Sequence, residues 1–170
     1  MHVMIATDGT LDTTKASDFV ARLFTDGDTV TVYTVVEIPR GMLDEMRAAA
    51  LDPADDKARE VGLEFRKTQA ESVAPKHWAG DDAVVNRYVK ARVTARTDDL
   101  VAALAANGVD AEVVGEEGEN AAKSVLTAAK DRNIDVLCIG THGHGRFEGL
   151  LGSLSTKLAR LAPCSVVLIR

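Results

Sequence analysis

Five short hydrophobic runs, each bounded by turn or polar residues, predict the strands of a sheet. Several of them are apolar at nearly every position, which is typical of parallel strands that are covered on both faces. The runs are VMIAT at residues 3–7, TVTVYTVV at 29–36, DAEVV at 110–114, DVLCIG at 135–140 and SVVLIR at 165–170. We therefore expect five β-strands at these positions.

Segments with helical periodicity separate most of these strands. Residues 13–24 place apolar side chains at positions i, i+3, i+4, i+7 and i+8, the pattern of an amphipathic helix, and Asp12 is a candidate N-cap. Residues 120–132 and 153–162 show the same periodicity, and Pro163 ends the last helix. Alternating strands and helices with short links predict an α/β fold with a parallel sheet, right-handed crossovers and helices on both faces.

The stretch between the second and third strands is longer than a single crossover helix requires. We expect three helical pieces in it, at residues 40–51, 53–73 and 81–107. The Arg and Lys side chains of residues 86–96 are interpreted as a solvated helix face in preference to a partner surface. The prediction is one domain over residues 1–170 with a helical insertion at about 40–107.

Composition and charge limit the classes of function that the sequence supports. The chain has 170 residues, 46% of them hydrophobic and 27% charged, which indicates a folded domain with a core. The net charge of −6 argues against nucleic-acid binding, and no apolar run approaches the roughly 20 residues of a membrane span. The N-terminus shows no signal-peptide pattern, and Cys138 and Cys164 are expected to be reduced thiols. We expect a cytoplasmic protein that binds neither nucleic acid nor membrane.

The glycine-rich segment GTHGHGRFEGLLGSLS, residues 140–155, carries most of the candidate chemistry. Glycines let a ligand approach the backbone, and the amides of a helix that starts near Ser153 favour an anion. The hydroxyls of Ser153 and Ser155 are further donors at the same end. The segment therefore predicts a phosphate site, or else a plain connection with a serine N-cap. If the first and fourth strands are neighbours, Asp8 faces this segment. Its carboxylate then accepts hydrogen bonds from a base or ribose, or it is an ordinary helix-start carboxylate.

Several of these motifs resemble the universal stress protein family. They are ATDGT at residues 6–10, EEGENAAKSVL at 116–126, and IGTHGHG…LLGSLS followed by APCSVVLIR at the end of the chain. The resemblance covers about 100 of the 170 residues, at both ends of the chain. It implies a doubly wound, Rossmann-like sheet of five parallel strands in the order 3-2-1-4-5. It also implies a homodimer through the last strand, residues 165–170, and ATP binding in part of the family.

Position by position, the resemblance implies an ATP site in the crevice between the loops after strands one and four. Mg²⁺ would be held by phosphate oxygens and not by protein ligands, so we assign no catalytic residue and no metal ligand. The implied adenine contacts are Ala6, Thr7, Asp8 and Val35. The implied ribose contacts are Ile139, Gly140 and Gly143. The implied phosphate contacts are Gly152, Ser153, Leu154 and Ser155.

The favoured hypothesis is a stress-response homodimer that binds ATP and changes its partners with occupancy. Between Gly143 and Gly152 lie eight residues, whereas the family's ATP-binding pattern has nine. This spacing favours a second hypothesis, a nucleotide-free dimeric interaction module with an unidentified protein partner. A slow ATP hydrolase is a third hypothesis, although the sequence lacks a P-loop, a dinucleotide fingerprint and a nucleophile elbow. His142 and His144 alone are too few to predict a metal site.

Overall fold

The computed structural model describes residues 1–38, 79–141 and 152–170, without side-chain detail at 79–84. The chain divides into two compact units, one formed by Met1–Glu37 with Arg92–Arg170 and the other by Ile38–Ala91. The helical pieces expected at residues 40–51 and 53–73 lie outside the described residues.

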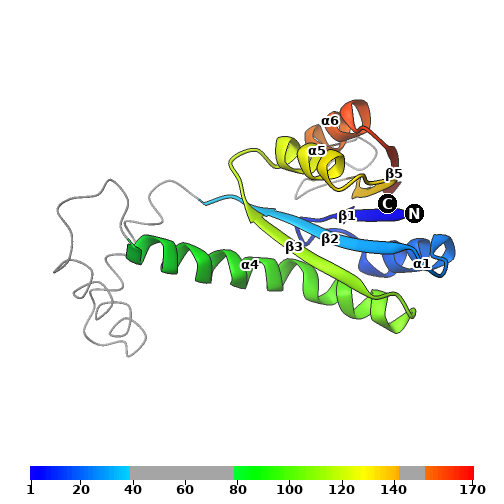
Figure 1. The fold of residues 1–170 in the computed structure, drawn as a ribbon, viewed down its shortest axis with the longest axis horizontal. Helices are drawn as coiled ribbons and strands as arrows, with labels where there is room; N and C mark the ends of the chain where they lie inside the picture. Colours follow the sequence, from blue (N-terminus) through cyan, green and yellow to red (C-terminus); the bar gives the residue numbers. More distant parts are fainter. Residues whose placement is uncertain (39–78, 142–151) are drawn as a thin grey trace. The chain divides into compact units, whose positions relative to one another are not determined.

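The first unit alternates strands and helices as the hydrophobic pattern predicts (Figure 1). Its strands are β1 (His2–Ala6), β2 (Thr29–Val36), β3 (Ala111–Glu117), β4 (Val136–Gly140) and β5 (Ser165–Ile169). The helices are α1 (Thr13–Leu23), α4 (Ala79–Ala106), α5 (Ala121–Asp131) and α6 (Ser153–Leu161), and α4 is shared with the second unit. The expected strands and the last expected helical piece are thus present, with β3 running three residues beyond its predicted end.

The five strands form one parallel sheet in the order β3-β2-β1-β4-β5, which confirms the predicted fold class and strand order. The central strand β1 pairs with β2 on one side and with β4 on the other. Its last residue, Ala6, lies opposite Tyr33 and Ile139. Since β2 continues to Val36, β1 ends three residues earlier than its neighbour. The strand order reverses at β1, and the carboxyl ends of the strands at such a switch point are where ligands bind in open α/β sheets.

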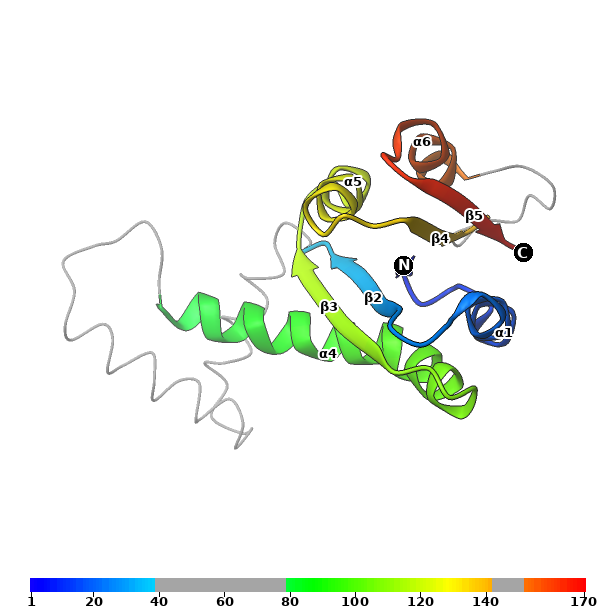
Figure 2. The same ribbon diagram turned by 45° about the vertical axis from the view of Figure 1, so that its right-hand side comes forward.

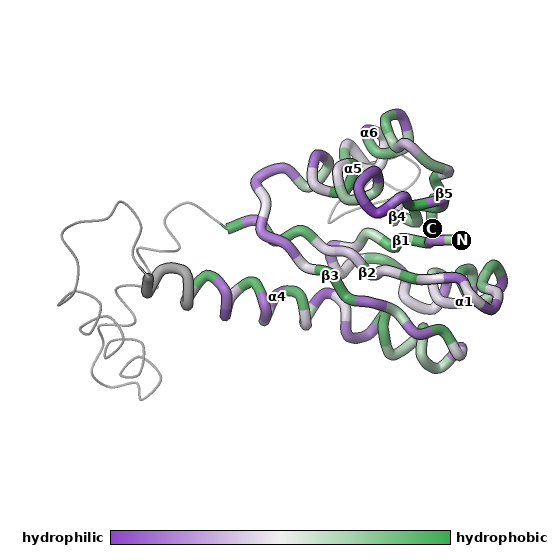
Figure 3. The backbone as a smooth tube through the Cα atoms, viewed as in Figure 1, coloured by the Kyte–Doolittle hydropathy of each residue, from purple (hydrophilic) through white to green (hydrophobic). Residues whose placement is uncertain are grey.

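Helices cover both faces of the sheet, with α1 and α4 on one side and α5 and α6 on the other (Figure 2). One buried cluster joins Val3, Ile5 and Val32 of the strands to side chains of α1 and α4. A second cluster joins Met4 and Tyr33 to side chains of α5 and α6. Strand residues thus alternate between two cores, and hydrophobic colouring follows the central strands in Figure 3. This arrangement explains why several of the strand sequences are apolar at nearly every position.

Helix α4 approaches β3 very closely at a glycine. A Cβ atom placed on Gly115 would lie only 2.1 Å from Cγ2 of Val93. Only a residue without a side chain therefore allows α4 to pack at this depth. The contact fixes the position of α4, and Arg96 lies one turn beyond Val93 on the same helix.

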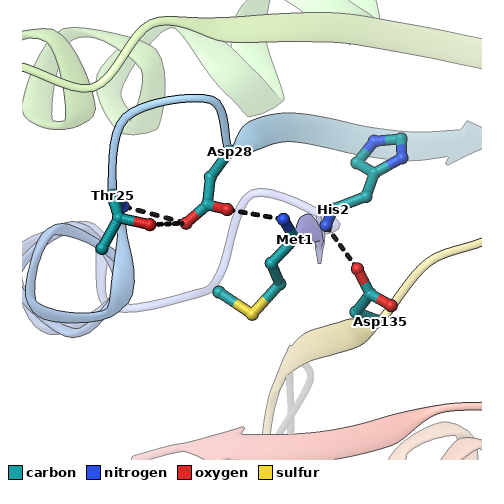
Figure 4. Close-up of polar contacts among 5 residues, drawn as sticks. All are labelled: Met1, His2, Thr25, Asp28 and Asp135. Atoms are coloured by element: carbon teal, nitrogen blue, oxygen red, sulfur yellow. Dashed lines mark hydrogen bonds and ion pairs between the residues drawn. The ribbon is translucent and has the colours of Figure 1, made fainter.

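The amino edge of the sheet is closed by polar contacts within the chain (Figure 4). The α-amino group of Met1 pairs with the Asp28 carboxylate, which also accepts from the backbone N–H and hydroxyl of Thr25. The backbone N–H of His2 donates to Asp135 at 2.7 Å. Because Asp28 and Asp135 directly precede β2 and β4, their side chains join the starts of three parallel strands.

The ring of His2 adds a second set of contacts at this edge. Nδ1 lies 3.1 Å from the carbonyl oxygen of Arg132, and Nε2 lies 2.9 Å from the hydroxyl of Thr31. A carbonyl oxygen can only accept, so Nδ1 carries the proton. In the neutral ring, Nε2 then accepts from Thr31. His2 therefore ties the end of α5 to β2.

The sequence predicts reduced cysteines and contains no apolar run as long as a membrane span. Cys138 is buried, and burial raises the pKa of its thiol to about 12, while Cys164 is partly exposed. Both cysteines are free thiols, as expected. Within residues 1–38, 79–141 and 152–170, no helix combines the length and apolarity that crossing a membrane requires.

Candidate functional site

The carboxyl edge of the sheet begins with the loop after β1, where the sequence predicts base contacts. The hydroxyl of Thr7 accepts from the backbone N–H of Gly9 at 3.0 Å. Oδ1 of Asp8 accepts from the backbone N–H of Thr10 at 3.0 Å and from its hydroxyl. Side-chain oxygens of this kind shape a turn locally. Asp8 is therefore not the cap of α1, and its exposed carboxylate lies in a loop that it helps to shape.

The end of β4 and the start of α6 form the second part of the site. The backbone N–H of Gly152 donates to the carbonyl of Thr141 at 3.0 Å, and the hydroxyl of Ser155 donates to the carbonyl of Gly140 at 2.8 Å. These two bonds hold the first turn of α6 against the end of β4. Since β4 pairs with β1, the carboxyl ends of these two strands are neighbours in the sheet. The β1 loop follows one of these ends, and the start of α6 is bonded to the other.

The contact made by Ser155 differs from the one predicted from the sequence. Ser155 was expected to offer a hydroxyl donor to phosphate, but its side chain is buried and its proton is used on the backbone of Gly140. Ser153, in contrast, is exposed at the first position of α6. Of the two serines, only Ser153 presents its side chain to solvent.

The helix starts differ in how their amides are satisfied. Asp12 caps α1 by accepting from the backbone N–H of Lys15, and Asn120 caps α5 by accepting from that of Lys123, at 3.0 Å in both cases. The N-cap of α6 is Gly152, which has no side chain to accept such a bond. The serine cap considered from the sequence is therefore absent, and the first amides of α6 lack a side-chain acceptor at their cap position.

A third part of the site lies at the end of β2, where Val35 was expected to contact a base. Its side chain is buried at 8% exposure, so a ligand would meet its backbone and not its side chain. The carbonyl of Val35 accepts from the guanidinium of Arg96 at 2.7 Å. Residues 86–96 were interpreted as a solvated helix face; that interpretation is wrong for Arg96, whose side chain is half-buried and reaches the sheet.

The remaining predicted residues are distributed over exposed, half-buried and buried positions. Leu154 is exposed, Ala6 and Gly140 are half-buried, and Ile139 is buried at 3% exposure. Gly143 lies outside the described residues. The structure thus brings the ends of β1, β2 and β4 and the start of α6 to one edge of the sheet, with mostly backbone groups available there.

Two features of the wider surroundings limit the chemistry of the site. Over the described ranges, no group of three or more His, Cys, Asp or Glu side chains is arranged to hold a metal ion. The hydroxyls of Tyr33 and Thr34 are buried on β2, and that of Thr34 makes no hydrogen bond within the described part of the chain. Burial raises the pKa of Tyr33 strongly, so its phenol is neutral. Among the described residues, the groups that this edge offers to a ligand are amides and hydroxyls.

Comparisons with known proteins agree with this architecture. A model of the universal stress protein family matches residues 1–170. Universal stress protein YxiE of Bacillus subtilis is 29% identical over 140 residues, which are 74% of this chain and 92% of that protein.

Among the solved structures that share the fold are two universal stress proteins with a bound nucleotide. An Arabidopsis thaliana universal stress protein family protein with AMP bound aligns with a TM-score of 0.54 and 14% identity, over 99% of this chain and 90% of that one. A universal stress protein in complex with cAMP aligns with a TM-score of 0.53 and 16% identity, over 100% and 96% of the two chains. At these identities the structural likeness concerns the fold.

Proposed function

Because the chain belongs to the universal stress protein family, we propose that it binds an adenine nucleotide between the β1 loop and the start of α6. One observation carries the proposal: Gly152 begins α6 without a side-chain cap, whereas α1 and α5 are both capped. A helix start of this kind keeps amide donors for an anion, and its dipole favours negative charge. Phosphate is the anion that suits such a position.

The relatives with AMP and cAMP support the choice of ligand. Both ligands contain an adenine base and a single phosphate group. In this chain the base is assigned to the loop of Ala6, Thr7 and Asp8. The phosphate is assigned to the backbone amides of the first turn of α6, which follow Gly152, and to the hydroxyl of Ser153. The finer form of the proposal is ATP, with Mg²⁺ held by its phosphate oxygens.

The second part of the proposal is a homodimer through β5, which is an edge strand of the sheet. Leu168 on this strand and Leu161 at the end of α6 are 39% and 56% exposed. An exposed apolar edge strand favours pairing with a copy of itself. Light scattering after size-exclusion chromatography should give twice the monomer mass of 18.1 kDa. A charged residue at position 168, as in Leu168→Lys, should shift the protein to monomer; a monomeric parent protein would contradict this part of the proposal.

Calorimetric titration tests the nucleotide proposal directly. AMP, ATP and ATP with Mg²⁺ are titrated separately, and the purified protein is also heat-denatured to detect any adenine nucleotide carried through purification. Binding of AMP is expected, and Mg²⁺ should increase the affinity for ATP. Absence of heat with all three ligands, together with no released nucleotide, would contradict the proposal.

A nucleotide-free interaction module is the second candidate, and specific contacts favour it. The hydroxyl of Ser155 and the carbonyl of Val35, both at the predicted site, are already bonded within the chain. A site whose polar groups are already hydrogen-bonded within the chain offers fewer hydrogen-bonding groups to a ligand. The same titration separates the two candidates.

A further inference from the structure

The carbonyl of Val35 lies just beyond the point where β1 stops. In the ladder, the backbone N–H of Thr7 donates to the carbonyl of Tyr33, whereas the carbonyl of Val36 accepts from Gly118 on the β3 side. Successive carbonyls of a strand point to alternate neighbours, so the carbonyl of Val35 points to the β1 side, where β1 has already ended. Because β1 ends early, the carbonyl of Val35 has no donor on that strand.

The guanidinium of Arg96 supplies the missing donor. The side chain is anchored along its stem, because a Cβ atom on Gly9 would lie 3.2 Å from Cγ of Arg96. Gly9 has a φ of +92°, so this close approach occurs where the β1 loop needs a glycine. Arg96 thus passes beneath the β1 loop and ends on the carbonyl of Val35 at 2.7 Å.

Within the described residues, no ion pair reinforces this contact. No carboxylate of these residues lies within ion-pair distance of Arg96, so none of them holds its charge in place. The guanidinium keeps further N–H donors, and its terminal torsions can turn while the stem stays on Gly9. Arg96 can therefore leave the carbonyl without moving α4.

We propose that Arg96 is an affinity-determining residue of the nucleotide site, which competes with the amino group of the base for the carbonyl of Val35. The inference rests on the proposed function, because it presupposes that an adenine lies in the β1 loop. An adenine edge offers one N–H donor group and reaches this carbonyl from the side left open by β1, which is the side that the guanidinium occupies. Binding of the base then requires Arg96 to turn away, and the lost charge-assisted bond lowers the observed affinity.

The experiment compares AMP with ribose 5-phosphate, which lacks the base, on matched variants. Arg96→Met keeps a long apolar stem on Gly9 and removes the donors, and Arg92→Met removes the same charge from an exposed position one turn earlier on α4. Arg96→Met should bind AMP about tenfold more tightly than the parent protein, since a hydrogen bond from a charged donor is involved. Its affinity for ribose 5-phosphate should not change, and Arg92→Met should not tighten AMP.

The possible results separate the competition from nucleotide binding itself. Equal or weaker AMP affinity in Arg96→Met overturns the competition, while measurable binding in both proteins leaves the proposed function standing. An equal gain for ribose 5-phosphate would also overturn it, since the effect would then be independent of the base. No AMP binding by any variant overturns both proposals. Arg96→Lys, with a shorter reach to the carbonyl, should also tighten AMP and serves as the second variant if Arg96→Met unfolds.

Discussion

At the amino edge of the sheet, the α-amino group of Met1 is paired with Asp28 and the backbone of His2 with Asp135. At the carboxyl edge, α6 starts without a side-chain cap, and the carbonyl of Val35 is held by a side chain of α4. The partners at the first edge come from residues that directly precede or begin strands. At the second edge, the carbonyl of Val35 depends on the long side chain of Arg96. The first amides of α6 have no side-chain acceptor at the cap position.

The difference follows from the unequal lengths of the central strands. All strands run in the same direction, so the starts of β1, β2 and β4 meet at one edge, where short acidic side chains join them. At the other edge β1 stops at Ala6 while β2 continues to Val36. Backbone groups of the longer strand are then left beside the end of the shorter one. Closing one edge stabilises the fold, and the open groups at the other edge are what a ligand can use.

The largest expected effect comes from Gly115→Ala, which disturbs the packing that positions Arg96. The new methyl group would overlap Cγ2 of Val93 at 2.1 Å, so α4 must shift away from β3. We expect a loss of about 3 kcal/mol in the free energy of unfolding, at the upper end for overpacking. Chemical denaturation of the two proteins measures it.

The control for this prediction is the same change in a Val93→Ala background. Removing the methyl groups that clash should recover most of the loss, so the two substitutions together should cost less than their sum. Strict additivity would show that the cost of Gly115→Ala does not come from the contact with Val93.

The fold was largely predictable because its signal is local. Several strand cores are nearly continuous apolar runs, and the bounds of β2 agree with the prediction. The exception is the end of β3, where Gly115, Glu116 and Glu117 have no apolar signal. They form strand because they pair with the last residues of β2, and a pairing partner 81 residues away is not visible in a local pattern.

The candidate site was predictable in place but not in its contacts. The glycine-rich segment and the turn at Asp8 indicated the carboxyl edge of β1 and β4. The hydrogen bond from Arg96 to Val35 joins residues 61 positions apart, and nothing in the basic helical segment singles out this arginine. Likewise, the sequence of α6 cannot tell that Ser155 faces the backbone of Gly140 while Ser153 faces solvent.

The next largest effect is expected for Gly152→Asp, which would make the start of α6 resemble those of α1 and α5. The backbone of Gly152 has a φ of −60°, a conformation that any residue adopts, so the aspartate can cap the first turn. Stability should rise by a few tenths of a kcal/mol. AMP affinity should fall by about tenfold or more, because the carboxylate takes the amides and repels the phosphate.

Gly152→Asn separates the two causes, since it adds a cap without a charge. It should weaken AMP less than Gly152→Asp does. Calorimetry measures the affinities and thermal unfolding measures the stabilities. Unchanged AMP affinity in both variants would remove the start of α6 from the site.

A smaller effect is expected for Asn120→Ala, which removes the cap of α5. The side chain of Asn120 accepts from the backbone N–H of Lys123, and its loss should cost about 1 kcal/mol of stability. AMP affinity should stay the same, because this helix start is satisfied within the chain and needs no ligand. Asn120→Asp keeps the acceptor and should restore most of the stability. A parallel loss of AMP binding in Asn120→Ala would mean that the capped and uncapped starts do not differ in function.

The smallest effect concerns pH and the closed edge. The hydrogen bond between the two groups raises the pKa of the Met1 amine above its ordinary value of 8.0 and is the main cause that lowers the pKa of Asp28 to about 2. The raised amine pKa means that its contribution to stability is complete below pH 8 and disappears as the pH rises through the folded value. The lowered Asp28 pKa means that its contribution is present above 3.8 and is lost as the pH falls towards about 2.

Thermal unfolding between pH 5 and 10 of the parent protein and of Asp28→Asn tests this sign, with a native, untagged amino terminus. Buried Cys138 also destabilises the fold at high pH, because its thiol ionises more easily when unfolded, but it does so in both proteins. The difference in stability between the two should therefore shrink above pH 8 and should be smaller in high salt, because exposed ion pairs are screened. A difference that stays constant from pH 5 to 10 would mean that the amine contributes nothing, and that Asp28 closes this edge through Thr25 alone.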